Sequence, residues 1–276
     1  TPDKCDFCHL TTNTPIDLIG KRIFNKYSAT AANAASYDQL SCLVIPTAEY
    51  HNPQQLNKQV FSDMLLTAKE WLDEVSNKNR ISQYPVITWN YGRRAGQSIF
   101  PHPHLSVLSA IGKPYSQVEK LRQNLADYLY FNSTPFFDDL AKSLEPLELV
   151  FPPKKQDEKS SNSKIILHLT PKREKEALII SDRFDNNFID SIYQTIDWYK
   201  SLNVTNFNLA IFLKPLNSKE TGWEGFPFLA RITDRGDANT KNSDMGAMEC
   251  YVTPVVSSDP LVMANSFKQH LKSKNL

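Results

Sequence analysis

Two histidines separated by one proline are the residues of this chain best suited to chemistry. They form the segment His102-Pro103-His104. In an extended strand, side chains two positions apart point to the same face and lie about 7 Å apart, so both imidazoles would address one site. Imidazole is a competent nucleophile at neutral pH, and a phosphorus centre can be transferred onto it and off again. From this spacing alone, a metal site or a surface pair explains the segment equally well.

A turn rich in glycine and arginine precedes the histidines. It supplies glycines for close backbone approach, two guanidinium groups and small polar donors, which together suit a phosphate group. It lacks the Gly-Lys-Ser/Thr ending of a Walker loop. The alternative is a hairpin turn with solvated arginines, but its place before the histidine segment favours phosphate binding. The candidate substrate-binding residues are Asn90, Gly92, Arg93, Arg94, Gly96, Gln97 and Ser98.

Two of the four cysteines, Cys5 and Cys8, are separated by two residues. In a reducing compartment this spacing indicates a metal site before a disulfide. A pair of free or redox-active thiols near a frayed terminus is the alternative. His9 is a rival ligand by adjacency to Cys8.

Composition excludes several classes of protein. The 31 lysines and arginines nearly balance the 30 aspartates and glutamates, so no global field favours nucleic acid or a membrane surface. No segment approaches the roughly 20 apolar residues of a membrane helix, and the N-terminal segment lacks a signal-peptide pattern. We therefore expect a cytoplasmic protein that binds neither nucleic acid nor membrane.

The elements that must position these residues can be read from periodicity. Residues 40–46 (LSCLVIP) and 84–90 (YPVITWN) predict strands, and 102–108 predicts a third extended segment. Apolar residues recur at three and four from Leu56 to Val75, which predicts a long helix with one buried face. Two further helices are expected over 116–130 and 135–144.

The same order of elements returns in the second half of the chain. Residues 151–164 predict a linker or surface loop, because their sequence is charged, rich in serine and without apolar periodicity. Beyond it, a strand is expected over 177–181, a helix over 188–202 and a strand over 206–215, and Phe226-Pro227-Phe228 echoes Phe100-Pro101-His102. We therefore expect an α+β fold with a catalytic half over 1–150 and a degenerate half over 165–276 that lacks the paired histidines.

The order of these features resembles the galactose-1-phosphate uridylyltransferase branch of the histidine-triad superfamily, with the related diadenosine tetraphosphate phosphorylases. Members carry Cys-x-x-Cys near the start, an Asn-bearing strand, a strand followed by His, a long helix, an Asn-x-Gly turn and His-Pro-His-x-Gln. The counterparts in this chain are Cys5 and Cys8, Asn25, His51, the Leu56–Val75 helix, Asn90 and Gly92, and His102 with His104.

The resemblance implies a histidine-triad-like (HIT-like) fold of two tandem α+β halves, each with an antiparallel sheet and a long packing helix. It implies that Cys5, Cys8, His51 and His102 bind a structural zinc ion, and that His104 accepts a nucleotidyl group. Asn25 would join the turn in binding the substrate. Two thiolates and two imidazoles make a closed tetrahedral set, as structural zinc requires.

This chain departs from the family pattern in three places. Ser106 stands where the family has glutamine, and a serine hydroxyl offers one donor from a shorter arm. The spacing from the turn to the histidines is one residue longer, around Phe100. Beyond the linker only His168 and His270 occur, so we expect the second, histidine-rich metal site of some relatives to be missing.

The function that follows is a nucleotidyltransferase or phosphorylase, with His104 and Ser106 as its catalytic residues. Its substrate would be a nucleotide sugar or a dinucleoside polyphosphate, and its second substrate a phosphate-bearing acceptor. The resemblance also admits a homodimer in which a second subunit closes over the substrate. Two alternatives stay open: a nucleotide hydrolase of the same superfamily, and a zinc-stabilised nucleotide-binding protein without transfer activity.

Overall fold

The computed structural model describes residues 2–78, 81, 83–152, 161–217, 221–237, 239, 245–248 and 252–275. The chain forms two compact units. The first comprises Thr1–Trp89, Gln97–Asp127 and Ala210–Phe226, and the second comprises Asn90–Gly96, Tyr128–Leu209 and Pro227–Leu276. Because their segments alternate along the chain, they do not test a division into consecutive halves at 150 and 165, which stays a prediction. Most of the expected linker, 153–160, lies outside the described residues.

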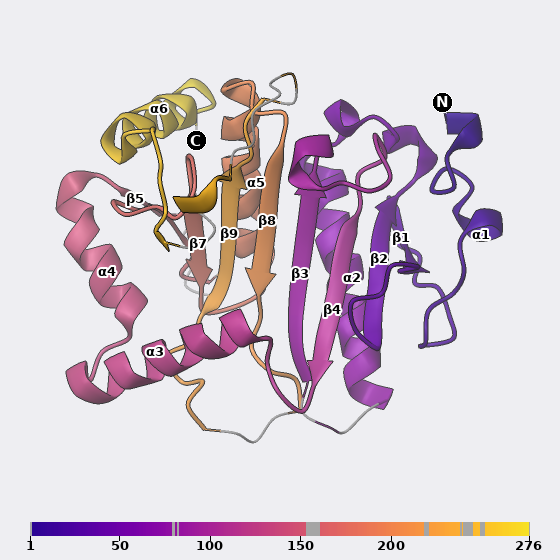
Figure 1. Ribbon diagram of the computed structural model, residues 1–276, viewed down its shortest axis with the longest axis horizontal. Helices are drawn as coiled ribbons and strands as arrows, with labels where there is room; N and C mark the ends of the chain where they lie inside the picture. Colours follow the sequence, from indigo (N-terminus) through magenta and orange to yellow (C-terminus); the bar gives the residue numbers. More distant parts are fainter. Residues whose placement is uncertain are drawn as a thin grey trace. The chain divides into compact units, whose positions relative to one another are not determined.

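Antiparallel strands and a few long helices make up the chain (Figure 1). No helix among the described residues is both long and apolar enough to span a bilayer. In chain order the main elements are α1 (Leu10–Asn13), β1 (Ser28–Ala32), β2 (Leu40–Pro46), α2 (Lys58–Lys78), β3 (Gln83–Tyr91), β4 (Leu105–Ile111), α3 (Ser116–Asn132), α4 (Phe136–Leu144), β5 (Val150–Phe151), β6 (Lys164–Leu167), β7 (Ala177–Ser181), α5 (Asn186–Ser201), β8 (Phe207–Phe212), β9 (Phe228–Asp234) and α6 (Pro260–Ser273).

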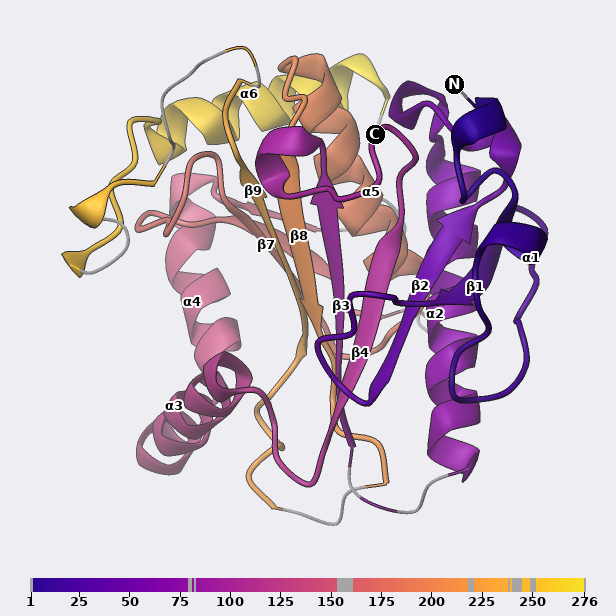
Figure 2. The ribbon, with the colours of Figure 1, turned by 45° about the vertical axis from the view of Figure 1, so that its right-hand side comes forward.

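In the first unit, β1, β2, β4 and β3 pair in that order, each antiparallel to its neighbour. Helix α2 packs against β1, β2 and β4 and covers one face of these strands (Figure 2). The predicted long helix is confirmed, and its apolar stripe is buried as expected. The buried residues of this stripe are Val60, Phe61, Met64, Leu65, Ala68, Trp71, Leu72 and Val75.

The strand register shows which residues lie on the face away from α2. The Ser28 hydroxyl bonds Thr67 of α2 at 2.8 Å, so Ser28 faces the helix and its neighbours alternate away from it. Ala31 therefore lies on the other face, as does Leu43, its partner across β1 and β2. Ser106 lies opposite Leu43 in β4, so it shares this face.

The N-terminal segment covers part of that face. Cys5 and Phe7 form a small buried cluster with Ala31, Leu43 and Ile45. Cys8, Leu10 and Ile99 pack around it. Cys5 and Phe7 are therefore part of the folded unit and lie against β1 and β2.

The second unit repeats the order strand, strand, helix, strand, strand. β6 pairs with β7 and β7 pairs with β9, as β1 pairs with β2 and β2 with β4. Helix α5 packs on β7, as α2 packs on β2. Its buried residues include Phe188, Ile192, Ile196, Trp198 and Tyr199. The expected strand over 177–181 and the expected helix over 188–202 are confirmed.

The glycine-arginine turn, Asn90–Gly96, belongs to the second unit. Its Gly92 has φ 89° and ψ 158°, a conformation open essentially to glycine alone. A Cβ at this position would lie 2.3 Å from Oδ1 of Asn206 and 2.6 Å from the carbonyl oxygen of Thr205. Both the backbone conformation and the close approach therefore require glycine.

We predict that Gly92→Ala lowers the free energy of unfolding by about 2–4 kcal/mol, because strain and overlap with Asn206 add together. The matched control is Gly20→Ala, where φ is also positive, at 76°, but no atom lies within 4 Å of the added Cβ. Urea unfolding of both variants measures the difference. Equal losses would show that Asn206 does not constrain the turn.

Candidate functional site

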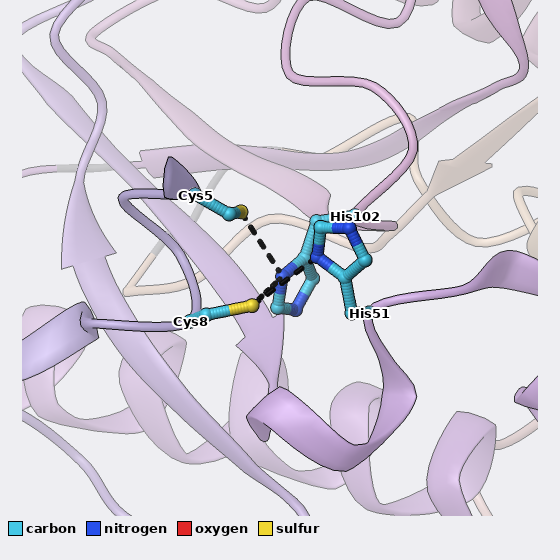
Figure 3. A group of neighbouring side chains, drawn as sticks. All are labelled: Cys5, Cys8, His51 and His102. Carbon is cyan, nitrogen blue, oxygen red and sulfur yellow. Dashed lines mark hydrogen bonds between the residues drawn. The ribbon is translucent and has the colours of Figure 1, made fainter. Parts of the chain in front are cut away.

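Four side chains from three separate segments meet in the first unit. Cys5 and Cys8 come from the N-terminal segment, His51 follows β2, and His102 precedes β4 (Figure 3). Their ligand atoms all lie within 4.8 Å of one another, and together they could hold a metal ion. His9, the alternative ligand by adjacency, is exposed and lies outside this cluster.

The spacing of these atoms fits four-coordinate geometry. In a tetrahedral site with metal–sulfur bonds near 2.3 Å and metal–nitrogen bonds near 2.0 Å, sulfur and nitrogen ligands lie roughly 3.5 Å apart. Sγ of Cys8 lies 3.2 Å from Nδ1 of His51 and 3.5 Å from Nδ1 of His102. Sγ of Cys5 lies 3.5 Å from the same His102 nitrogen. The donor set therefore matches a metal in both ligand type and spacing.

The orientation of His102 also suits a metal ligand. Its Nε2 lies 2.9 Å from the carbonyl oxygen of Pro46, to which it donates. Nδ1 is then left unprotonated and faces the sulfur atoms, the arrangement that metal-bound histidines use. Burial lowers the pKa of His102 to about 4, so the ring is neutral at neutral pH.

The Cys8 thiol needs a nearby cation to ionise at neutral pH. Burial, and then the neighbouring Cys5, raise the pKa of Cys8 to about 11. A divalent metal would reverse this effect, because it stabilises both thiolates and releases their protons. Metal affinity should therefore rise with pH.

His104 is held beside the cluster as a neutral ring. It is 7% exposed, and its Nδ1 lies 3.1 Å from the carbonyl oxygen of His102, to which it donates. Burial lowers the pKa of His104 below its ordinary value of 6.5. The proton then resides on Nδ1, so Nε2 carries a lone pair. A neutral imidazole with this tautomer is a nucleophile.

One aromatic ring lies against both histidines. The centroid of the Phe7 ring is 5.1 Å from that of His104 and 5.8 Å from that of His102, and both contacts are nearly perpendicular. Edge-to-face contacts of this kind favour a fixed ring orientation. Phe7 lies between the two cysteines in sequence, so the segment that would hold the metal also packs against His104.

Gln97 supports the backbone of the histidine segment. Its side chain is buried, and Nε2 donates to the carbonyl oxygens of Ile99 at 2.9 Å and His102 at 2.8 Å. The His102 carbonyl therefore accepts from both Gln97 and His104. The predicted contact of Gln97 with substrate is not tested by these bonds and stays a prediction.

Ser106 and a residue that the sequence did not indicate share the face of His104. Thr88 of β3 lies directly opposite Ser106 in the register of β3 and β4. Both are half-buried, and neither hydroxyl bonds to any other described residue. Alternation along YPVITWN marks Thr88 as one of a same-face set with Val86 and Asn90, but only the register shows its partner.

An apolar cleft of about 200 Å³ opens beside Phe7 and Cys8 in the first unit. Asn25 is exposed at its rim, and its Nδ2 donates to Thr67 at 2.8 Å. Phe7 lines this cleft and also contacts the ring of His104. The lining of the cleft includes Phe7, Cys8, Leu10, Phe24, Asn25, Ile45 and Thr47.

The predicted site residues are therefore divided between the two units. The first unit contains the cluster, His104, Ser106, Asn25, Gln97 and the exposed Ser98. The second unit contains Asn90, Gly92, Arg93, Arg94 and Gly96. Sequence spacing could not reveal this division, because contacts with Asn206 and Asn208, far along the chain, determine it.

The fold is similar to those of solved structures. An ADP-glucose phosphorylase from Arabidopsis thaliana, crystallised with bound ADP-glucose, has a TM-score of 0.74 and 14% identity over 96% of this chain and 89% of that one. A galT-like protein from Arabidopsis thaliana gives 0.69 and 16% over 96% and 91%. A uridylyltransferase gives 0.67 and 14% over 92% and 85%. No protein-family model and no curated protein matches the sequence.

These similarities establish the fold. The α+β architecture that the resemblance to the galactose-1-phosphate uridylyltransferase branch implied is confirmed, with antiparallel strands and a packing helix in each unit. At 14–16% identity they show the fold alone, so the reaction has to be argued from the chemistry of the site.

We predict that the purified, reduced protein holds about one metal ion per chain and that Cys5→Ser loses it, because a hydroxyl is a poor replacement for a thiolate ligand. The variant should melt at least about 5 °C lower. Elemental analysis by mass spectrometry, with a thermal melt, measures both effects. Cys42→Ala is the control, since Cys42 is fully buried away from the cluster. A metal-free wild type would contradict the prediction.

Proposed function

We propose that this protein is a nucleotidyltransferase or phosphorylase in which Nε2 of His104 attacks the α-phosphorus of a nucleotide sugar or dinucleoside polyphosphate. The observation that carries the proposal is the hydrogen bond from Nδ1 of His104 to the His102 carbonyl, which leaves Nε2 with its lone pair. The similar solved structures include an ADP-glucose phosphorylase and a uridylyltransferase, whose names agree with this chemistry.

The reaction takes two steps. In the first, a bond forms between Nε2 and the α-phosphorus, and the bond from phosphorus to the leaving sugar phosphate or nucleoside polyphosphate breaks. The ring becomes cationic, and the His102 carbonyl stabilises it by accepting from Nδ1. In the second, an oxygen of the phosphate-bearing acceptor attacks phosphorus and the bond to Nε2 breaks. The neutral ring is restored for the next cycle.

The apolar cleft supplies a place for the nucleobase. Its walls are mainly apolar, and Asn25 and Thr47 are among the polar groups that could orient a bound ring. Phe7 contacts His104 and also lines this cleft, so a base held there would lie close to the histidine that attacks phosphorus. Arg93, Arg94 and the other turn residues keep their predicted role in substrate binding.

The metal is proposed to be zinc in a structural role. Two thiols and two imidazoles are the ligands of closed zinc sites, and all four positions are taken by protein side chains. The ion would tie Cys5 and Cys8 to the backbone that presents His104. Its contribution is to folding energy and to orientation, and no step of the reaction passes through it.

We predict that His104→Ala keeps its metal and its fold but loses the transfer reaction almost completely, while His102→Ala loses metal and stability. Incubation of wild type with labelled ADP-glucose, UDP-glucose or diadenosine tetraphosphate, without acceptor, should leave an acid-labile, base-stable label on the protein. Labelling should persist below pH 6.5, since burial lowers the pKa of His104.

The exposed His9 provides the matched control, because His9→Ala should label like wild type. A fully active His104→Ala enzyme would rule out the covalent route. Addition of phosphate, glucose 1-phosphate or neither separates phosphorolysis, transfer and hydrolysis. Absence of both labelling and turnover would favour the nucleotide-binding alternative.

Ser106 gives a second prediction. Its half-buried hydroxyl has no protein partner among the described residues, so it can donate to a phosphoryl oxygen. We expect Ser106→Ala to lower kcat/KM about ten- to a thousandfold, and Ser106→Gln to be tolerated with a modest change in rate or acceptor preference. Steady-state kinetics on whichever substrate is used most efficiently provides the measurement. An unchanged Ser106→Ala enzyme would remove this hydroxyl from the mechanism.

A further inference from the structure

Three side chains of the second unit form a directed series of hydrogen bonds that ends at the predicted turn. Nη1 of Arg235 donates to Oδ1 of Asn208 at 2.5 Å. Nδ2 of Asn208 donates to Oδ1 of Asn90 at 2.7 Å and to the carbonyl oxygen of Ala95 at 2.8 Å. Arg235 and Asn208 lie more than a hundred residues beyond Asn90 in the chain.

Chemistry leaves only one orientation for the Asn208 amide. A guanidinium group can only donate and a backbone carbonyl can only accept. Asn208 must therefore turn its oxygen to Arg235 and its nitrogen to Ala95. Each of these two partners alone identifies the oxygen and the nitrogen of the amide, which shape alone cannot distinguish.

The orientation of Asn90 follows from that of Asn208. Since Asn208 offers a donor, Asn90 must present Oδ1 to it, and its own Nδ2 points elsewhere. Among the described residues, Nδ2 of Asn90 makes one hydrogen bond, to the carbonyl of Gly96, at a long 3.4 Å. Asn90 is exposed, so its second amide hydrogen is available to a ligand.

The backbone of the turn is held by the same region. Nε of Arg94 donates to the carbonyl of Arg235 at 2.8 Å, and the backbone N–H of Arg94 donates to Oδ1 of Asn206 at 3.1 Å. Besides the bond from Asn208 to the Ala95 carbonyl, two contacts that do not depend on the Asn208 amide therefore fix the turn in place. A change at Asn208 can alter the direction of the Asn90 amide without releasing the turn.

We propose that Arg235 and Asn208 are positioning residues that turn the amide of Asn90 so that Nδ2 donates to an anionic oxygen of a phosphate-bearing ligand. With the opposite orientation, Oδ1 would face the same oxygen and repel it. The class of ligand rests on the proposed function, whereas the orientation of the amide does not. Asn208 and Arg235, which follow the paired histidines by more than a hundred residues, would thus determine which ligand atoms the turn accepts.

The test exploits the difference between an amide and a carboxylate. In Asn208→Asp, the carboxylate still accepts from Arg235 but offers only acceptors to Asn90, which must then turn its Nδ2 inward and its Oδ1 outward. In Asn208→Ala, Asn90 is free to adopt either orientation. Calorimetric titration with AMP should show a loss of about threefold for Asn208→Ala and about thirtyfold or more for Asn208→Asp.

A double-mutant cycle separates orientation from the added negative charge. In an Asn90→Ala background the amide is gone, so both changes at Asn208 should cost less than about threefold. Arg235→Lys should bind like wild type, because an ammonium is also donor-only, whereas Arg235→Leu should lose at most about the threefold of Asn208→Ala, because the Ala95 carbonyl still orients the Asn208 amide. A thermal melt of each variant checks that affinity does not simply follow stability.

Two results would overturn the inference alone: an Asn208→Asp protein that binds AMP like wild type, or one whose loss persists in the Asn90→Ala background. A wild type that binds neither AMP nor ADP-glucose would overturn the proposed function together with this inference. The inference is supported if affinity for AMP falls in the order Asn, Ala, Asp at position 208, and if these differences disappear in the Asn90→Ala background.

Discussion

The candidate site depends on the backbone carbonyl of His102. It accepts one hydrogen bond from Nδ1 of His104, which sets the tautomer of that ring, and another from the buried Gln97 amide, which sets the position of the carbonyl itself. The side chain of the same residue points into the cysteine cluster. One residue therefore links the group that would hold a metal to the group that would attack phosphorus.

The N-terminal segment has few apolar contacts with which to hold this arrangement. Its buried cluster with the sheet contains Cys5 and Phe7, while Ile16 and Leu18 nearby remain exposed. Burial at about 25 cal/mol per Å² of apolar surface gives a short segment little stability of its own. A metal bound by Cys5 and Cys8, which lie on either side of Phe7 in the sequence, would add folding energy to this segment.

Local patterns were sufficient to predict some of this structure. Apolar spacing identified α2 and α5, because a helix buries one stripe whatever lies beyond it. The resemblance brought Cys5, Cys8, His51 and His102 together correctly. Thr88 was missed because its place beside Ser106 comes from the pairing of two strands. The register between two strands depends on contacts between residues that are distant in sequence, and the alternation of residues along one strand does not reveal it.

The turn at Asn90 also depends on contacts that local sequence patterns cannot reveal. Its glycines and arginines indicated a phosphate-binding loop, and Gly92 does require glycine, but the atom that demands it belongs to Asn206. The direction of the Asn90 amide likewise depends on a guanidinium group far along the chain. Residues beyond position 200 therefore determine what this turn presents to a ligand, because an amide side chain offers a defined end only when a donor-only or acceptor-only partner orients it.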